Sequence, residues 1–178
     1  MNRRDVSTAL VASIGLAACQ GDNAYALIGK KLPLIRGVYT DGTGFDLTTF
    51  AKPALIRFWG MWCSPCMLDM PHWLSVIAQV RAREQPLNDS SIVTIHVGLP
   101  PESGPNLTQW VDAQASQTAT RVVNDASFAI MKAVGISGTP STLYIDRNGI
   151  IREHAWQFKN ARGVASFIRK ITSLHNKE

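Results

Sequence analysis

Cys63 and Cys66 are the residues of this chain whose type and spacing best suit covalent chemistry. Two thiols three residues apart can close a disulfide within one turn of a helix. They lie in the run Trp59-Gly60-Met61-Trp62-Cys63-Ser64-Pro65-Cys66, where Trp62 precedes the first thiol and Pro65 precedes the second. This arrangement favours reversible thiol–disulfide exchange over a static structural cross-link.

The position of the two thiols in the predicted elements gives them different roles. Residues 53–59 form a short apolar run typical of a central strand, and a helical pattern begins at Ser64. Cys63 therefore falls at a helix N-terminus, whose partial positive charge and free N–H groups stabilise a thiolate. Pro65 is tolerated in this first turn because its missing N–H would be unpaired there. We expect Cys63 to attack a substrate disulfide and Cys66, one turn further in, to resolve the mixed disulfide.

The rest of the chain alternates between strand-like and helix-like segments. A turn at residues 41–44 predicts a β-hairpin within residues 37–47, and the helix after the thiols should run to about Glu84 with Pro71 inside it. That helix should bury Leu68, Trp73, Ile77 and Val80 on one side. Further strands are expected at 91–99, 121–123, 142–145 and 150–154, and further helices at 107–119, 126–134 and 162–174. The pattern predicts an α/β fold, a central mixed sheet flanked by helices with an N-terminal hairpin.

Length, composition and charge are those of one globular domain. The chain has 178 residues, of which 46% are hydrophobic, and a net charge of +5 that is spread thinly along it. The basic runs are too short to indicate a nucleic-acid partner, and no apolar run reaches the length of a membrane span.

The N-terminus has the pattern of an export signal. Arg3-Arg4 is followed by the short apolar stretch Val6–Leu16, and Leu16-Ala17-Ala18-Cys19 resembles a bacterial lipobox. We interpret residues 1–18 as a lipoprotein-type signal peptide, 19–36 as a tether and 37–178 as the folded domain. The alternative is ordinary cleavage after Ala26, which would leave a soluble periplasmic protein.

Lipidation also accounts for the odd number of cysteines. The chain has three, and a lipid on Cys19 would leave only the redox pair. Acyl chains would tether the protein to a membrane without spanning it, in the oxidising bacterial periplasm. A reduced dithiol in that compartment would need an electron donor.

Two separated motifs resemble the thioredoxin superfamily. Phe58-Trp59 followed by the Cys63–Cys66 motif matches that family's strand end and redox site, and Pro71 matches its helix proline. Far downstream, residues 134–143 (VGISGTPSTL) look like its cis-proline loop. The resemblance spans residues 37–175 and implies that Pro140 lies beside the disulfide. It also implies that Thr139 offers backbone groups to an extended substrate, while Trp62 lines the client-binding surface.

Within the superfamily the chain most resembles the TlpA/ResA/DsbE-like, membrane-tethered thiol-disulfide oxidoreductases. This resemblance implies reduction of client disulfides, apocytochromes c among them, with recharging by a membrane electron donor. It implies no cofactor beyond the Cys63–Cys66 disulfide. Ser64-Pro65 lacks the histidine found between the cysteines of strongly oxidising relatives, which favours a reductase. A thiol oxidase or isomerase and a copper-binding metallochaperone are the alternatives.

Arg57 departs from the thioredoxin pattern, which has an acid six residues before the first cysteine. A cation there would favour thiolates rather than accept a proton. Asp69 lies three residues after Cys66 and can share its helical face. Our hypothesis is that Asp69 accepts the proton of Cys66, paired with Arg57. The alternative is that Arg57 points outward or has its charge at a strand edge, with Asp69 solvated.

The remaining candidates are better explained by packing. His72 could join the two thiols in a copper site but is expected on the surface, so we predict no metal site. His96, in an apolar strand, is expected to be a satisfied core or strand-end histidine rather than a catalytic base. Phe58, Trp59 and Trp73 are expected in the core.

Overall fold

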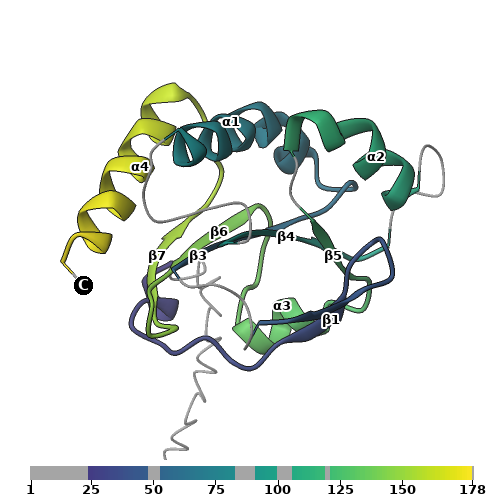
Figure 1. Cartoon of the computed structure of the whole chain (residues 1–178), viewed down its shortest axis with the longest axis horizontal. Coiled ribbons are helices and arrows are strands. Elements are labelled where there is room, and N and C mark those ends of the chain that lie inside the picture. Colours follow the sequence, from purple (N-terminus) through teal and green to yellow (C-terminus); the bar gives the residue numbers. More distant parts are fainter. Residues whose placement is uncertain (1–23, 48–52, 83–90, 100–105, 119–120, 178) are drawn as a thin grey trace, which may run out of the picture.

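The computed structural model describes residues 24–47, 53–82, 91–99, 106–118 and 121–177 (Figure 1). At its centre lies a five-stranded sheet of order β5-β4-β3-β6-β7. The strands are β3 (Ala54–Trp59), β4 (Ile92–Val97), β5 (Val122–Asp125), β6 (Ser141–Ile145) and β7 (Ile151–Ala155). β3, β4 and β5 are parallel to one another, whereas β6 and β7 pair antiparallel. The predicted mixed sheet is confirmed.

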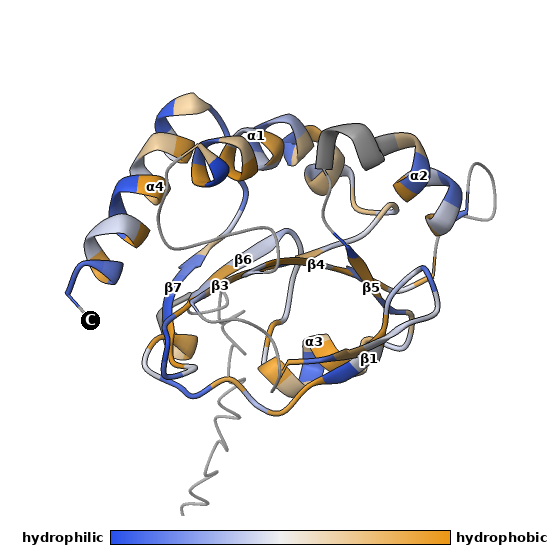
Figure 2. Cartoon of the chain, in the orientation of Figure 1, coloured by the Kyte–Doolittle hydropathy of each residue, from blue (hydrophilic) through white to orange (hydrophobic). Residues whose placement is uncertain are grey.

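The sheet separates two layers (Figure 1). Helices α1 (Ser64–Arg81), α2 (Leu107–Thr118) and α4 (Ala161–His175) cover one face, while α3 (Ala129–Val134) and the hairpin β1 (Arg36–Val38) and β2 (Gly44–Asp46) cover the other. β3 and β4 are buried along their whole length, as strands covered on both faces must be, and most but not all of their residues are hydrophobic (Figure 2). Within the described residues no helix has the length and hydrophobicity of a membrane span.

Helix α1 buries a stripe that differs from the predicted one. Its buried residues are Cys66, Asp69, Met70, Trp73, Val76, Ile77 and Val80. Leu68 is 72% exposed, so its prediction as a core residue was wrong. The stripe recurs every three or four residues from Cys66, which places Asp69 inside and Leu68 on the opposite side.

Helix α3 begins later than the sequence pattern predicts. The chain from Ala126 forms a turn, and Phe128 at the helix N-cap has a left-handed φ of 61°. The Asp125 carboxylate at the end of β5 accepts hydrogen bonds from the N–H groups of Ile130 and Met131, at 3.1 and 2.9 Å. The helix therefore starts where this carboxylate can satisfy its first free N–H groups.

Residues 24–35, expected within the tether, are packed against the domain. A short 3-10 helix, η1 (Ala24–Leu27), precedes a stretch in which Leu32 and Ile35 are buried, as is Leu27. The N–H of Gly29 donates to the carbonyl of Ile151 at 2.8 Å, which ties this stretch to β7. Its apolar side chains explain the packing, because they join the core on the hairpin side of the sheet.

Candidate active site

The redox site begins where β3 ends. Cys63 and Cys66 form a disulfide with an S–S distance of 2.11 Å and a Cα–Cα distance of 5.2 Å. Cys63 is the N-cap of α1, and its sulfur accepts a hydrogen bond from the N–H of Cys66 at 3.2 Å. Ser64 and Pro65 form the first two positions of the helix. The predicted placement of Cys63 at a helix N-terminus is confirmed, and the N–H of Cys66 in the first turn of the helix is directed at its sulfur.

The two sulfurs differ in access. Cys63 is 4% exposed and Cys66 is fully buried, while Ser64 and Pro65 beside them face solvent. Of the two cysteines, Cys63 alone keeps any exposed surface within the described residues, so an external sulfur has better access to it.

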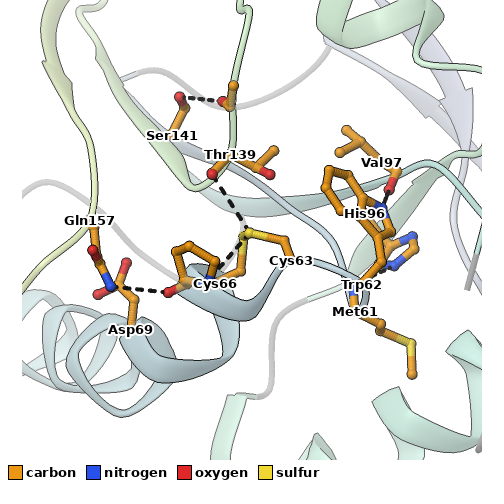
Figure 3. Close-up of a disulfide and its surroundings, with 12 residues drawn as sticks. Met61, Trp62, Cys63, Cys66, Asp69, His96, Val97, Thr139, Ser141 and Gln157 are labelled. Atoms are coloured by element: carbon orange, nitrogen blue, oxygen red, sulfur yellow. Dashed lines mark hydrogen bonds between the residues drawn. A yellow bond between two sulfur atoms is a disulfide. The ribbon is translucent and has the colours of Figure 1, made fainter. Parts of the chain in front are cut away.

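The cis-proline loop forms the facing wall of the site (Figure 3). The Thr139–Pro140 peptide bond is cis, and the Thr139 carbonyl oxygen lies 3.6 Å from Cys63 Sγ. Ser141 Oγ donates to the Gly138 carbonyl at 2.9 Å, and His154 Nε2 lies 3.2 Å from the same Oγ. The loop is thus held from behind, and the structure brings Thr139 and Pro140 to Cys63 as the resemblance implied.

Trp62 forms the opposite wall. Its indole N–H donates to the Val97 carbonyl at 2.8 Å, while half of the side chain (49%) is exposed. The ring lies so close to Gly60 and Gly98 that a Cβ at either position would come within 2.6 and 2.9 Å of its Nε1. The backbone of β4 and of the preceding loop therefore fixes Trp62 beside the disulfide.

Arg57 and Asp69 form a buried ion pair beneath the helix. Both side chains are fully buried, and Arg57 Nη2 lies 2.7 Å from Asp69 Oδ2. Arg57 Nη1 donates to Thr142 Oγ1 at 3.1 Å, and its guanidinium lies 5.1 Å from the centroid of the Trp73 ring. The predicted pairing is observed, and the alternative of an outward Arg57 and a solvated Asp69 is wrong.

The second carboxylate oxygen of Asp69 is also engaged. Oδ1 accepts the backbone N–H of Phe158 at 2.9 Å, so the pair links β3, α1 and the segment after β7. Burial lowers the pKa of Arg57, and the Asp69 carboxylate opposes this shift. A guanidinium keeps its charge in proteins, so Arg57 brings a positive charge into this buried contact.

Three contacts of the site were missed in the sequence. The N–H of Met61 donates to His96 Nε2 at 3.0 Å, Gln157 Nε2 donates to the Pro65 carbonyl at 3.3 Å, and Phe158 binds Asp69 as described. For His96 the only signal was a polar residue in an apolar strand. The other two depend on the path of the chain after β7, which no local pattern specifies.

The remaining candidate residues either lie away from the disulfide or belong to the part of the chain that the structure does not describe. His72 is partly exposed on α1, and among the described residues no group of three or more His, Cys, Asp or Glu side chains is placed to hold a metal ion. Cys19, the predicted lipidation site, lies outside the described residues.

Known proteins share both sequence and fold with this chain. The Redoxin family matches residues 27–162. The thiol:disulfide interchange protein DsbE of Escherichia coli (strain K12) is 30% identical over 160 residues, covering 86% of this chain and 78% of that protein. The thiol-disulfide oxidoreductase ResA of Geobacillus thermodenitrificans is 28% identical over 116 residues, covering 64% and 60%.

Solved structures agree on the fold. The thioredoxin domain of a thiol-disulfide oxidoreductase from Bacteroides vulgatus has a TM-score of 0.57 at 18% identity, covering 80% of this chain and 96% of that one. A thio-disulfide isomerase from Thermus thermophilus has a TM-score of 0.58 at 16% identity, covering 81% and 96%.

A mixed sheet of this order with a redox disulfide at a helix N-terminus opposite a cis-proline defines a thioredoxin-like thiol-disulfide oxidoreductase. The chain belongs to the Redoxin family, and its activity is thiol–disulfide exchange of the DsbE/ResA type.

Proposed function

We propose that this protein is a periplasmic reductase that donates electrons from Cys63 and Cys66 to disulfides of exported client proteins, apocytochromes c being one client class. The observation that carries the proposal is the asymmetry of the disulfide. Cys63 Sγ faces the cis-proline loop, whereas Cys66 is fully buried. One sulfur is thus placed to meet a client, and the other to release it.

The proposed reaction consists of two successive thiol–disulfide exchanges. In the reduced protein, the Cys63 thiolate attacks one sulfur of a client disulfide, forming a mixed disulfide and expelling the other client sulfur as a thiolate. The Cys66 thiolate then attacks Cys63 Sγ, which releases the second client thiolate and forms the Cys63–Cys66 disulfide. The client gains two electrons, and a membrane dithiol donor restores the reduced protein by the same exchange in reverse.

Exposed apolar side chains near the disulfide support a protein as the client. Trp62, Met67 and Leu99 belong to the large hydrophobic residues that remain 37% to 73% exposed. Trp62 and Met67 each neighbour a cysteine in the chain, and Leu99 follows the strand that holds Trp62. Apolar surface next to a reacting sulfur suits an unfolded or extended polypeptide. Thr139, beside the cis-proline, offers backbone groups to such a chain.

Trapping with Cys66→Ser tests the assignment of the two cysteines. This variant should accumulate mixed disulfides between Cys63 and its clients, which mass spectrometry would identify. Cys63→Ser is the matched control and should trap none. Equal trapping by the two variants would contradict the division of roles.

The direction of electron flow is tested separately by the reduction potential. We propose a reductase because Ser64-Pro65 contains no histidine that would stabilise the reduced thiolate. A measured potential near that of strong thiol oxidants, about −120 mV, would instead assign an oxidase.

Attachment to the membrane through a lipid on Cys19 completes the proposal. Cleavage after Ala26 would make Leu27, whose side chain is packed in the core, the first residue and would remove the rest of η1 (Ala24–Leu27). We therefore favour the lipoprotein signal over this alternative. Mass spectrometry of protein extracted from membranes should find diacylglycerol on Cys19, and an unmodified terminus at Leu27 would rule the anchor out.

A further inference from the structure

His96 is a buried titratable side chain in contact with the loop that carries the first thiol. It lies at the end of β4, fully buried, and its Nε2 accepts the N–H of Met61 at 3.0 Å. Met61 lies two residues before Cys63, in the loop between β3 and α1. Within the described residues, His96 Nδ1 has no hydrogen-bond partner.

The hydrogen bond to Met61 specifies the state of the imidazole. An amide N–H can only donate, so Nε2 must carry a lone pair and the ring proton must be on Nδ1. Burial supports this neutral form, since desolvation lowers the pKa of His96 to about 4. Trp59 holds the ring in place through an edge-on contact with a centroid distance of 5.1 Å.

A second hydrogen bond joins β4 to the same loop, between Val97, which follows His96, and Trp62, which follows Met61. The Val97 carbonyl accepts the indole N–H of Trp62, directly after the contact between His96 and Met61 (Figure 3). The loop then closes on itself, because the N–H of Cys63 donates to the Gly60 carbonyl at 3.1 Å. Two consecutive acceptors on a rigid strand thus fix the two residues that lead into the reactive cysteine.

We propose that His96 is a positioning residue for thiol–disulfide exchange, in which its neutral imidazole holds the Met61 amide and thereby orients Trp62 and Cys63 toward the incoming sulfur. His96 acts through the loop, since its hydrogen bond is to Met61 and not to either cysteine. The inference holds for either direction of electron flow, so it stands or falls separately from the proposed reductase function.

Two substitutions of His96 by residues with side-chain amides test whether the acceptor atom at the position of Nε2 matters, independently of the imidazole ring. The side-chain oxygen of His96→Gln can occupy the place of Nε2, whereas that of His96→Asn reaches only the place of Nδ1. The reduced proteins would be reacted with oxidised glutathione, and second-order rate constants compared. We expect His96→Gln to remain within about twofold of the wild type and His96→Asn to fall about tenfold, the effect of one lost hydrogen bond.

Thr94→Val is the matched control, because Thr94 is buried on the same strand two residues earlier and should leave the rate unchanged. Equal rates in the two His96 variants, whether fast or slow, would overturn the proposal, because the acceptor atom would then not matter.

A measurement on the wild-type protein covers the case in which a variant fails to fold. Long-range ¹H–¹⁵N spectra at neutral pH should show His96 with its proton on Nδ1, and the Met61 amide should exchange slowly although it lies in a loop. A proton on Nε2 would overturn the proposal.

Discussion

The guanidinium of Arg57 and the carboxylate of Asp69 meet 2.7 Å apart with no solvent access to either side chain. Charges so deeply buried are costly to separate, because a remaining partner would keep its desolvation penalty without compensation. The pair also joins α1 to β3, three residues after Cys66 in the helix that carries the redox site.

Removing one partner of this pair should destabilise the protein strongly. We expect Arg57→Met or Asp69→Asn to lower the free energy of unfolding by about 3–5 kcal/mol. The double variant Arg57→Met/Asp69→Leu should lose less than either, since no charge is left unpaired. Urea denaturation measures all three. Arg36→Met, which breaks the exposed pair with Asp46, is the control and should cost no more than about 1 kcal/mol; similar losses at both pairs would contradict this account.

Asp69 should also affect the resolution step if it accepts the proton of Cys66. We expect Asp69→Asn to slow the attack of Cys66 on a preformed Cys63 mixed disulfide by about a hundredfold, because an amide cannot take up the proton. Rapid-quench kinetics measures this step, and alkylation of Cys63 should proceed normally. Asp125→Asn, at another buried carboxylate, is the control. An unchanged resolution rate would remove Asp69 from proton transfer.

A side chain at Gly98 should displace the wall formed by Trp62. Gly98 has a φ of +77°, and a Cβ there would lie 2.7 Å from the Phe128 ring and 2.9 Å from Trp62 Nε1. Gly98→Ala should therefore cost about 1–3 kcal/mol of stability and lower the rate of client reduction. Gly42→Ala shares the positive φ but meets no atom within 4 Å, so it should leave the reduction rate unchanged. Thermal unfolding measures the loss of stability in each variant, and an insulin reduction assay measures the effect of a displaced Trp62 on activity.

His96 should make stability depend on pH. Its pKa is about 4 in the folded protein and about 6.5 in an unfolded chain. At pH 7 His96 is mostly neutral in both states, so the folded state keeps nearly its full stability. As the pH falls below 6.5, the unfolded state binds the proton first, so stability is lost progressively until about pH 4. Urea midpoints measured from pH 7 to pH 4 should fall less in His96→Gln than in the wild type; parallel curves would contradict the assignment.

The reactive pair and the cis-proline could be predicted from the sequence because each lies in a short motif with defined neighbours. Cys63, Cys66 and Pro140 carry this information locally, and the alternation of strands and helices gives the sheet around them. The start of α3 was predicted less well, since it depends on the carboxylate of Asp125.

The supporting contacts could not be predicted because they depend on both faces of buried strands. Every residue of β3 and β4 is buried, so alternation does not reveal which side Arg57 or His96 faces. Leu68 was assigned to the core by its hydrophobicity, whereas the polar Asp69 occupies that place. An ion pair with Arg57 makes this burial tolerable, and such compensation appears only in three dimensions.

The hydrogen bond between Gly29 and Ile151 shows at which end of the sheet the segment before β1 lies. Ile151 starts β7, and Ala155 ends it beside the redox site, because Ala155 pairs with Thr142 and Phe58 pairs with Ser141. The segment that begins at Ala24 is therefore attached, through Gly29, to the end of the sheet that lies away from the redox site. That end is about 13 Å along β7 from the end nearest Cys63. A client docking at Cys63 and the N-terminal segment do not compete for the same side of the domain.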